Sequence, residues 1–297
     1  MTQERHNLFF RRAPEKRLSQ SQAKAMFLQA GQRIRWLADE KTKDVASAVP
    51  IRLGRRCFLV TAAHFIAEHP TPLVVREEGA RDVPLGFVRV VCGDPDNEDV
   101  AALEMTQDQA RTLRDCADEK SILVRWDRRY PRAVLVSGFP VQAVLHRGPK
   151  FHGGTGNVDG SRTVPSRRWP RLGVDSIASC KRDIIIEFAT NGGSFPLYGT
   201  ELLDVNRLPP SDHTDPRGMS GGGVWLSVSR ERRCGIWAPN LQLVGIQVGW
   251  QKDARVLRAV LIEKLLDLLD LNYPDLDEAI ERVRRRRIRW RKPEPRT

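Results

Sequence analysis

The sequence predicts an all-β fold assembled from many short strands. Apolar runs rich in Val, Ile, Leu and Phe are bounded by Gly, Pro, Asp or Asn, the residues that end strands and form turns. Such runs stand at residues 48–53, 57–62, 73–76, 87–91, 100–104, 122–126, 133–137, 184–188 and 224–228. Many short strands separated by turns are typical of barrels. With 297 residues, 40% of them hydrophobic, the chain can bury the core of one such domain and carry extensions.

The most informative stretch is the glycine-rich segment DPRGMSGGGVW at residues 215–225, which has one serine in its middle. We interpret Ser220 as a candidate nucleophile, because the flanking glycines permit positive φ and leave its hydroxyl open to a carbonyl substrate. The backbone N–H groups of Gly218 and Ser220 could form an oxyanion hole. A serine among glycines can also be a plain surface turn, so the hypothesis depends on residues elsewhere.

A serine hydroxyl is a weak nucleophile and needs an imidazole base that is oriented by a carboxylate. His64 ends the apolar run at residues 58–63, and Asp99 opens the run at 100–103 after a polar turn. The chain order of the three residue types is therefore His64, Asp99, Ser220.

This order separates three families of serine hydrolase. The segment 218–222 also fits the Gly-x-Ser-x-Gly elbow of α/β-hydrolases, in which the acid and the base follow the serine. No histidine follows Ser220 here; the six are His6, His64, His69, His146, His152 and His213. The subtilisin order needs an aspartate before the histidine, and we expect neither Asp39 nor Asp44 to end a buried apolar strand. The order that begins with histidine remains.

The blocks TAAH at 61–64, DVAAL at 99–103 and GMSGG at 218–222 resemble the three signature blocks of trypsin-like serine proteases. The segments SGFP at 137–140 and LVGI at 243–246 are similar to further parts of these enzymes, and the resemblance covers residues 46–271. It implies two six-stranded antiparallel β-barrels and a C-terminal helix. It also implies a serine endopeptidase with His64 as base and acid, Asp99 as orienting carboxylate, Ser220 as nucleophile and the Gly218 and Ser220 amides as oxyanion donors.

The resemblance further implies a specificity pocket made by Thr214, Asp215, Val248, Gly249 and Trp250. Thr214 stands six residues before the nucleophile, where trypsin has the aspartate that selects Arg and Lys. Trp250 stands where the family has a small or flexible residue. We therefore expect a restricted pocket that prefers small or uncharged residues, unless the Asp215 carboxylate turns into it.

Two departures from the family pattern bear on regulation. Met219 precedes the nucleophile, where secreted trypsins have an aspartate that pairs with a newly cleaved amino terminus. Phe65 follows the histidine in place of a half-cystine. Both departures suit a bacterial intracellular member that needs no N-terminal cleavage, and we expect latency to be relieved by a protein partner or ligand that orders the loops at 147–171 and around Ser220.

Cysteine usage and the N-terminus predict a cytoplasmic protein. The five cysteines, at 57, 92, 116, 180 and 234, are odd in number and form no C-x-x-C motif. This favours free thiols over a disulfide framework or zinc site, with Cys57 and Cys92 as core residues. We expect neither metal nor cofactor. Residues 1–17 contain no apolar stretch of signal length, and nothing approaches a membrane span.

We expect a basic, helical N-terminal extension at 1–45, a protease domain at 46–272 and a basic tail at 273–297. Capping residues from Ser19 predict a helix to about Ala38, and a leucine stripe predicts another at 256–271. Of the net charge of +12, eight positive charges lie in the segment Arg282–Lys292. This tail could bind nucleic acid, although such runs are more often solvated ends, and we expect its deletion to spare peptide hydrolysis.

Two functions remain open at this point. The first is a serine endopeptidase acting on protein substrates, used as a regulated cytosolic effector or processing enzyme, for instance in stress or antiviral defence signalling. The second is a catalytically idle protease-fold module that binds through its basic tail. The presence of all three catalytic residue types in the required order favours the endopeptidase.

Overall fold

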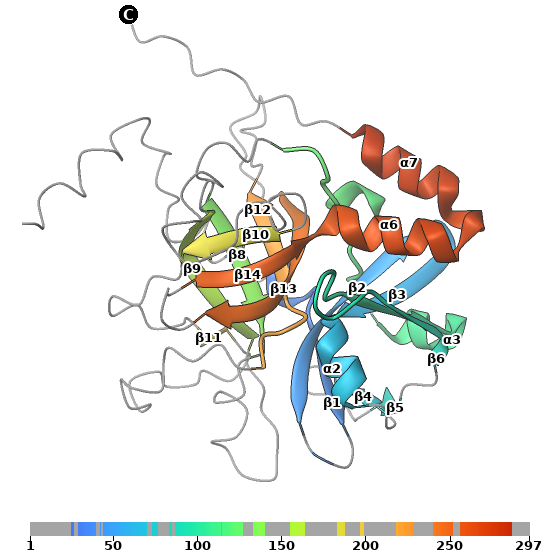
Figure 1. Cartoon of the computed structure of the whole chain (residues 1–297), viewed down its shortest axis with the longest axis horizontal. Helices are drawn as coiled ribbons and strands as arrows, with labels where there is room; N and C mark the ends of the chain where they lie inside the picture. Colours follow the sequence, from blue (N-terminus) through green and yellow to red (C-terminus); the bar gives the residue numbers. More distant parts are fainter. Residues whose placement is uncertain are drawn as a thin grey trace, which may run out of the picture.

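The computed structural model describes residues 25–26, 29–39, 42, 44–69, 73–76, 83–84, 87–113, 115–126, 133–139, 155–163, 183–187, 197–198, 218–227, 240–251 and 256–286. These residues form two antiparallel sheets with few helices. Figure 1 shows strands β1–β7 gathered on one side of the molecule and β8–β14 on the other. The predicted all-β fold of two antiparallel halves is confirmed. The predicted count of six strands in each half is corrected to seven in each described sheet, and the first sheet's described strands form no closed ring of pairings.

The first sheet has seven strands in the order β5-β4-β1-β2-β3-β7-β6. Gly54, at φ +55°, closes the turn of the predicted β2–β3 hairpin with a backbone conformation that other residues rarely adopt. Two short helices, α2 (Ala63–Glu68) and α3 (Gln107–Thr112), directly follow strands β3 and β7. The strands are β1 (Arg35–Asp39), β2 (Val45–Leu53), β3 (Arg56–Thr61), β4 (Leu73–Arg76), β5 (Val83–Pro84), β6 (Phe87–Cys92) and β7 (Ala101–Met105).

The second sheet also has seven strands, in the order β10-β14-β13-β12-β8-β9-β11. Strand β9 pairs in addition with β10, at Ile186↔Thr163, so six of the strands form an unbroken cycle of pairings. Strand β11 is attached to β9 outside this cycle. The strands are β8 (Ala133–Gly138), β9 (Thr155–Thr163), β10 (Asp183–Glu187), β11 (Leu197–Tyr198), β12 (Gly223–Ser227), β13 (Leu241–Gln251) and β14 (Val256–Leu261).

The largest cluster of buried side chains joins the two halves. It includes Phe58 of the first sheet, Trp225 of the second and Leu265 of the C-terminal helix, all fully buried. Each buried side chain of this size contributes about 1.5–3 kcal/mol through the hydrophobic effect. The two halves are therefore packed on one another, and loops from both can meet at their junction.

Strand β1 corrects the predicted N-terminal helix. Residues 29–31 are helical, but Arg35–Asp39 is a strand that pairs with both β2 and β4. The first sheet thus begins inside the predicted extension 1–45. Four of the five residues of β1 are buried, because a strand between two neighbours can be covered on both faces. Such a strand shows no alternation of apolar and polar residues that would identify it in the sequence. The same strand ends at the buried Asp39, contrary to the expectation that no buried strand ends there.

The C-terminal part of the second half corrects the predicted helix at 256–271. Residues Val256–Leu261 form strand β14, and helix α6 covers only Ile262–Asn272. Leu257 and Leu261 are four residues apart, a spacing that places side chains on one face of either a helix or a strand. The leucine stripe therefore could not locate the boundary between them.

The predicted basic tail at 273–297 is partly folded. A 3₁₀ turn, η5 (Pro274–Leu276), leads into helix α7 (Asp277–Arg285), which buries Ala279, Ile280 and Val283. Figure 1 shows α6 and α7 lying over the side of the molecule formed by β2 and β3. Deletion from Pro274 would remove part of the core, contrary to the expectation that this segment is dispensable. Among the described helices, none is long and apolar enough to cross a membrane.

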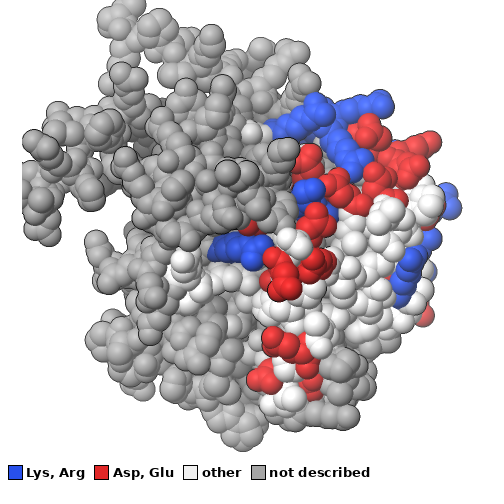
Figure 2. Space-filling model, viewed as in Figure 1, with Lys and Arg blue, Asp and Glu red and all other residues white. Residues whose placement is uncertain are grey.

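Several basic residues of the predicted tail form ion pairs within the fold. Arg282 Nε lies 2.9 Å from Glu119 Oε2, and Arg284 Nη1 lies 2.7 Å from Asp270 Oδ2. Figure 2 shows the blue Lys and Arg side chains of this region set among red Asp and Glu side chains. This half of the basic segment is therefore electrostatically matched by the folded domain.

We predict that Ile280→Ala lowers the free energy of unfolding by about 2–5 kcal/mol, because it opens a cavity where α7 meets the core. Leu271→Ala is the matched control, because that side chain is 83% exposed, and it should change stability by less than about 0.5 kcal/mol. Urea unfolding of both variants measures the difference. Equal, small effects would show that α7 does not belong to the cooperative core.

Candidate active site

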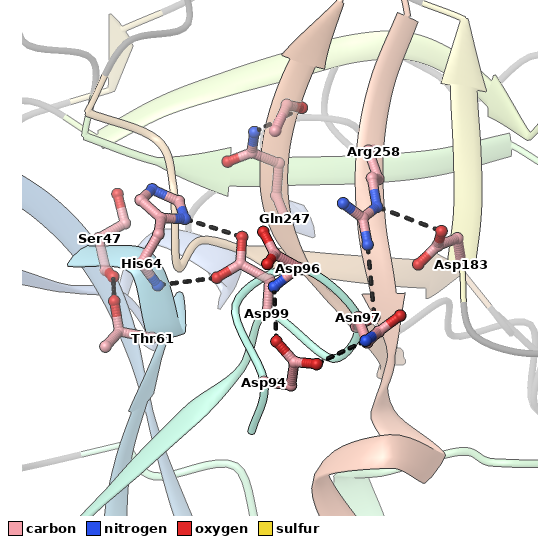
Figure 3. Close-up of polar contacts among 11 residues, drawn as sticks. Ser47, Thr61, His64, Asp94, Asp96, Asn97, Asp99, Asp183, Gln247 and Arg258 are labelled. Carbon is pink, nitrogen blue, oxygen red and sulfur yellow. Dashed lines mark hydrogen bonds and ion pairs between the residues drawn. The ribbon is translucent and has the colours of Figure 1, made fainter. Parts of the chain in front are cut away.

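His64 and Asp99 are joined by two hydrogen bonds (Figure 3). The His64 backbone N–H donates to Asp99 Oδ1 at 2.9 Å, and ring atom Nδ1 lies 2.8 Å from Asp99 Oδ2. His64 is in the first turn of α2, whose N-terminal residue provides no side-chain cap. The Asp99 carboxylate therefore satisfies a helix N–H that would otherwise lack a partner, and fixes the ring with its other oxygen.

A tight turn before β7 delivers Asp99 to this position. The Asp94 carbonyl accepts the Glu98 N–H at 2.6 Å, and the Asp94 side chain accepts the N–H of Asp96 at 3.0 Å. A Cβ on Gly93 would lie 2.3 Å from the Glu98 carbonyl oxygen, so this close approach needs glycine. The polar turn that the sequence showed thus fixes the point at which the chain enters the strand.

Strand β14 of the second half supports the same turn. Arg258 Nη2 donates to the carbonyl of Asn97 at 3.5 Å, and its Nε lies 3.2 Å from Oδ2 of the buried Asp183 (Figure 3). The guanidinium group therefore links the second barrel to the segment that carries Asp99.

The environment of His64 favours its protonated form. The hydrogen bond to Asp99 raises the pKa of the His64 imidazole above its usual range, and partial burial opposes this effect to a smaller extent. Its side chain is half-buried, whereas Asp99 is 5% exposed. A base with this pKa can accept a proton readily, and the carboxylate stabilises the resulting imidazolium.

The segment around Ser220 is a turn whose backbone requires glycine. Gly218 and Gly221 have φ of +86° and +87°, values that L side chains rarely adopt. A Cβ on Gly221 would lie 1.9 Å from the carbonyl oxygen of Ser47. Met219, between them, is fully buried in the core of the second half. The turn is thus pressed against the first half while its methionine anchors it in the second.

Strand β2 holds this turn through Ser47, a residue that the sequence did not single out. The Ser47 N–H donates to the Ser220 carbonyl at 2.8 Å, and its hydroxyl donates to the Gly218 carbonyl at 2.8 Å. The same hydroxyl accepts the Phe139 N–H at 2.7 Å, and the Ser47 carbonyl accepts the Thr61 hydroxyl at 2.8 Å. Ser47 therefore connects the Ser220 turn to β8 and to β3, the strand that leads to His64.

Backbone bonds also set the direction of the Ser220 amide. Its N–H shares a peptide plane with the Met219 carbonyl, which accepts the Gly222 N–H at 2.8 Å. In a planar trans peptide the N–H and the C=O point in opposite directions, so the Ser220 N–H points away from Gly222. It is left free for an oxyanion, as the proposed donor role requires. Among the described contacts of the His64 ring, none runs to the Ser220 hydroxyl; such catalytic bonds often tighten only when substrate binds.

The predicted pocket residues are only partly described. Thr214 and Asp215 lie outside the described residues. Val248 is buried, and Trp250 is half-buried and packs against the core of the second half. Gly249 lies between them on β13 at a register shift opposite β14. The size of the pocket stays a prediction.

Among the residues that the structure describes, no group of three or more His, Cys, Asp or Glu side chains is placed so that it could hold a metal ion. Of the two cysteines predicted as core residues, Cys57 is buried, whereas Cys92 is exposed on β6, the last strand in the order of the first sheet.

Comparison with known proteins supports the architecture. No family model and no curated protein sequence matches the chain. An inactivated protease paralogue from the scabies mite has a solved structure with a TM-score of 0.52 and 13% identity, over 84% of this chain and 98% of its own. The chain has the trypsin-like serine protease fold.

Two further solved structures with this fold were found at lower similarity. The HtrA-type protease AlgW, solved with a tripeptide, has a TM-score of 0.43 and 15% identity over 84% of this chain and 62% of its own length. The chain therefore spans less than two thirds of that protein. Rv3671c from M. tuberculosis, in an inactive mutant form, has a TM-score of 0.42 and 14% identity over 83% of this chain and 89% of its own.

We predict that Asp99→Asn lowers the pKa of the His64 imidazole, because the negative charge that stabilises the imidazolium is lost. An NMR titration of the ring protons measures this shift without any need for activity. In the wild type the neutral base forms only at higher pH, so the acid limb of any pH–rate profile should lie above the usual histidine range. An unchanged titration midpoint in the variant would show that the two side chains are not coupled.

We also predict that Ser47→Ala reduces kcat about tenfold or more with little change in KM, because the Gly218 carbonyl loses its partner and the turn shifts. The matched control is Ser121→Ala, another buried serine, whose hydroxyl donates to Asp118 Oδ1 at 2.7 Å away from the site. Both variants should lose about 1–3 kcal/mol of stability. If Ser121→Ala lowers kcat as much as Ser47→Ala does, the loss in both variants comes from general destabilisation and Ser47 has no specific role in positioning the turn.

Proposed function

We propose that the chain is a serine endopeptidase with Ser220 as nucleophile, His64 as general base and acid, and Asp99 as the residue that orients the imidazole. The observation that carries this proposal is the pair of hydrogen bonds that one buried carboxylate accepts from the backbone N–H and the ring of His64. A carboxylate at Nδ1 holds the tautomer in which Nε2 is free to accept a proton.

In the proposed reaction, His64 Nε2 removes the proton of the Ser220 hydroxyl as its oxygen attacks the scissile carbonyl carbon. The tetrahedral oxyanion is stabilised by the N–H groups of Gly218 and Ser220. His64 then donates the proton to the leaving amine, and an acyl-enzyme remains. Water, deprotonated by the same imidazole, releases the acid and restores the serine.

We further propose a regulated intracellular enzyme that is activated without N-terminal cleavage. The buried Met219 supports this: it anchors the turn through apolar packing, where an aspartate would need a charged partner. Protein is the proposed substrate, with small or uncharged residues at the cleavage site. A role as a bacterial cytosolic effector in stress or antiviral defence is the biological setting that we propose for it.

The second candidate is an idle module that binds through its basic end. The scabies mite structure, described as an inactivated protease paralogue, is an example of this fold in a protein named as inactive. Against this candidate, this chain has the full set of catalytic residue types. In addition, Arg282, Arg284, Arg285 and Arg286, half of the eight basic residues of its terminal segment, make ion pairs or hydrogen bonds within the fold.

Labelling with a fluorophosphonate probe distinguishes the two candidates. We expect the wild type to be labelled at Ser220, and Ser220→Ala and His64→Ala to lose labelling and about 10⁴-fold or more of peptidase activity, because the three residues act as a unit. Ser121→Ala is the control for general damage and should still be labelled. A folded wild type that resists the probe and cleaves no peptide library would favour the binding module.

A further inference from the structure

Helix α2, which carries the proposed base His64, is too short to hold its own place. It has six residues, of which only Ala63 and Phe65 are buried, and no side chain caps its first turn. A helix of this length is not stable by itself, so contacts at its two ends must fix it. Asp99 holds the first turn through the backbone and the ring of His64. The other end of the helix needs an anchor of its own.

His69 provides that anchor. Its backbone N–H donates to the Phe65 carbonyl at 3.0 Å, and its ring lies against the Phe65 ring with the centroids 4.6 Å apart. Ring atom Nδ1 lies 3.2 Å from Asp39 Oδ2, and Nε2 lies 3.8 Å from Asp44 Oδ2. The side chain of His69 is 11% exposed and that of Asp39 is 2% exposed, so their contact is shielded from water.

Both carboxylates belong to the connection between β1 and β2, which is tightly bonded. Asp39 ends β1, and its N–H donates to the Asp44 carbonyl at 2.9 Å. The Thr42 N–H donates to Asp39 Oδ1 at 3.1 Å, and the Thr42 hydroxyl accepts the Asp44 N–H at 3.2 Å and lies 3.4 Å from Nδ1 of the histidine ring. One oxygen of Asp39 thus holds the connection, while the other faces the end of α2. Figure 1 shows α2 beside β1 and β2.

The same stretch of chain reaches the nucleophile turn three residues later. Asp44 directly precedes β2, and Ser47 is the third residue of that strand. Ser47 fixes the Ser220 and Gly218 carbonyls, and its own carbonyl accepts the hydroxyl of Thr61, which lies just before α2. The stretch 39–47 therefore contacts the helix of the base and the turn of the nucleophile.

We propose that His69 and Asp39 are positioning residues, which hold α2 against the stretch 39–47 and so set the distance from the His64 imidazole to the Ser220 hydroxyl. These roles rest on the proposed function, and both side chains act through the helix rather than on the substrate. The sequence presented them separately, as one of six histidines and as an unsuitable subtilisin-like acid. Their pairing depends on how the β1–β2 connection folds onto α2.

The test compares His69→Asn with His69→Gln in the full-length protein. The amide nitrogen of Asn can take the place of Nδ1 and keep the contact with Asp39, whereas that of Gln takes the place of Nε2 and loses it. We expect His69→Gln to lower kcat and the rate of fluorophosphonate labelling about tenfold or more with little change in KM, because the base is misplaced. His69→Asn should stay within about threefold of the wild type.

A second readout needs no activity. The nitrogen NMR shifts of the His64 ring report whether the neutral ring keeps its proton on Nδ1, the tautomer that the bond to Asp99 favours. We expect a mixture of tautomers in His69→Gln and the wild-type shifts in His69→Asn. If the wild type is neither labelled nor active on peptides, the proposed function fails, and these shifts still decide whether His69 positions the ring.

Thr106→Ala is the matched control. It removes the capping box of α3, a second six-residue helix, at the end of β7 remote from Asp99. We expect it to lower stability and to leave the labelling rate and the His64 shifts unchanged. Equal losses in the two His69 variants, wild-type behaviour of both, or an equal loss in Thr106→Ala would overturn the positioning roles.

Thr42→Val replaces His69→Gln if that variant does not fold. It removes the hydroxyl that joins the β1–β2 connection to the His69 ring, and it changes no charge. We expect the labelling rate to fall about threefold or more, because the end of α2 is held less firmly. A folded Thr42→Val with the wild-type labelling rate and wild-type His64 shifts would count against the anchor.

Discussion

The candidate site depends on the close backbone contact between strand β2 and the turn that carries Ser220. Ser47 donates its N–H to the Ser220 carbonyl and its hydroxyl to the Gly218 carbonyl, so one residue of the first half fixes two carbonyls of the second. The contact leaves no room for side chains: a Cβ on Gly221 or on Gly138 would lie within 3 Å of Ser47 atoms. The glycines around the serine therefore serve packing between the halves as well as access to the hydroxyl.

Burial of Asp99 next to His64 is the second constraint. A buried carboxylate is tolerated only when its oxygens accept hydrogen bonds, and here both accept from His64. Because the folded-state pKa of His64 is raised, the stabilisation from this pair is fully present below the unfolded pKa of histidine. It is lost as the pH rises through the folded value. In the proposed mechanism the neutral base works at the pH where this contribution fades. The hydrogen bond from the His64 backbone N–H to Asp99 Oδ1 does not depend on the charge of the ring, so it continues to hold the carboxylate there.

The sequence predicted the parts of the site that carry their own chemistry. His64, Asp99 and Ser220 were singled out because each stands at the boundary of an apolar run, in the chain order that trypsin-like proteases share; the structure brings His64 and Asp99 together, and the role of Ser220 stays a prediction. Ser47 was missed because a serine within a strand has no distinctive pattern, and its partner Gly218 is 171 residues away. The strand β14 and helix α7 were missed for a different reason: spacings of four residues fit both kinds of element, and charge runs do not reveal which arginines find partners.

The geometry of the candidate site depends on how the two halves are placed relative to each other. Met219 fixes the Ser220 turn to the core of the second half, whereas His64 and Asp99 belong to the first. Helix α7 reinforces this arrangement from outside, since Arg286 at its end donates to the Ile122 carbonyl at 2.9 Å and to Gln242 Oε1 at 3.3 Å. These two acceptors lie on the segment entering the second half and on β13. A partner that moved α7 would therefore act on the junction between the halves, and through Ser47 on the distance between the proposed base and its nucleophile.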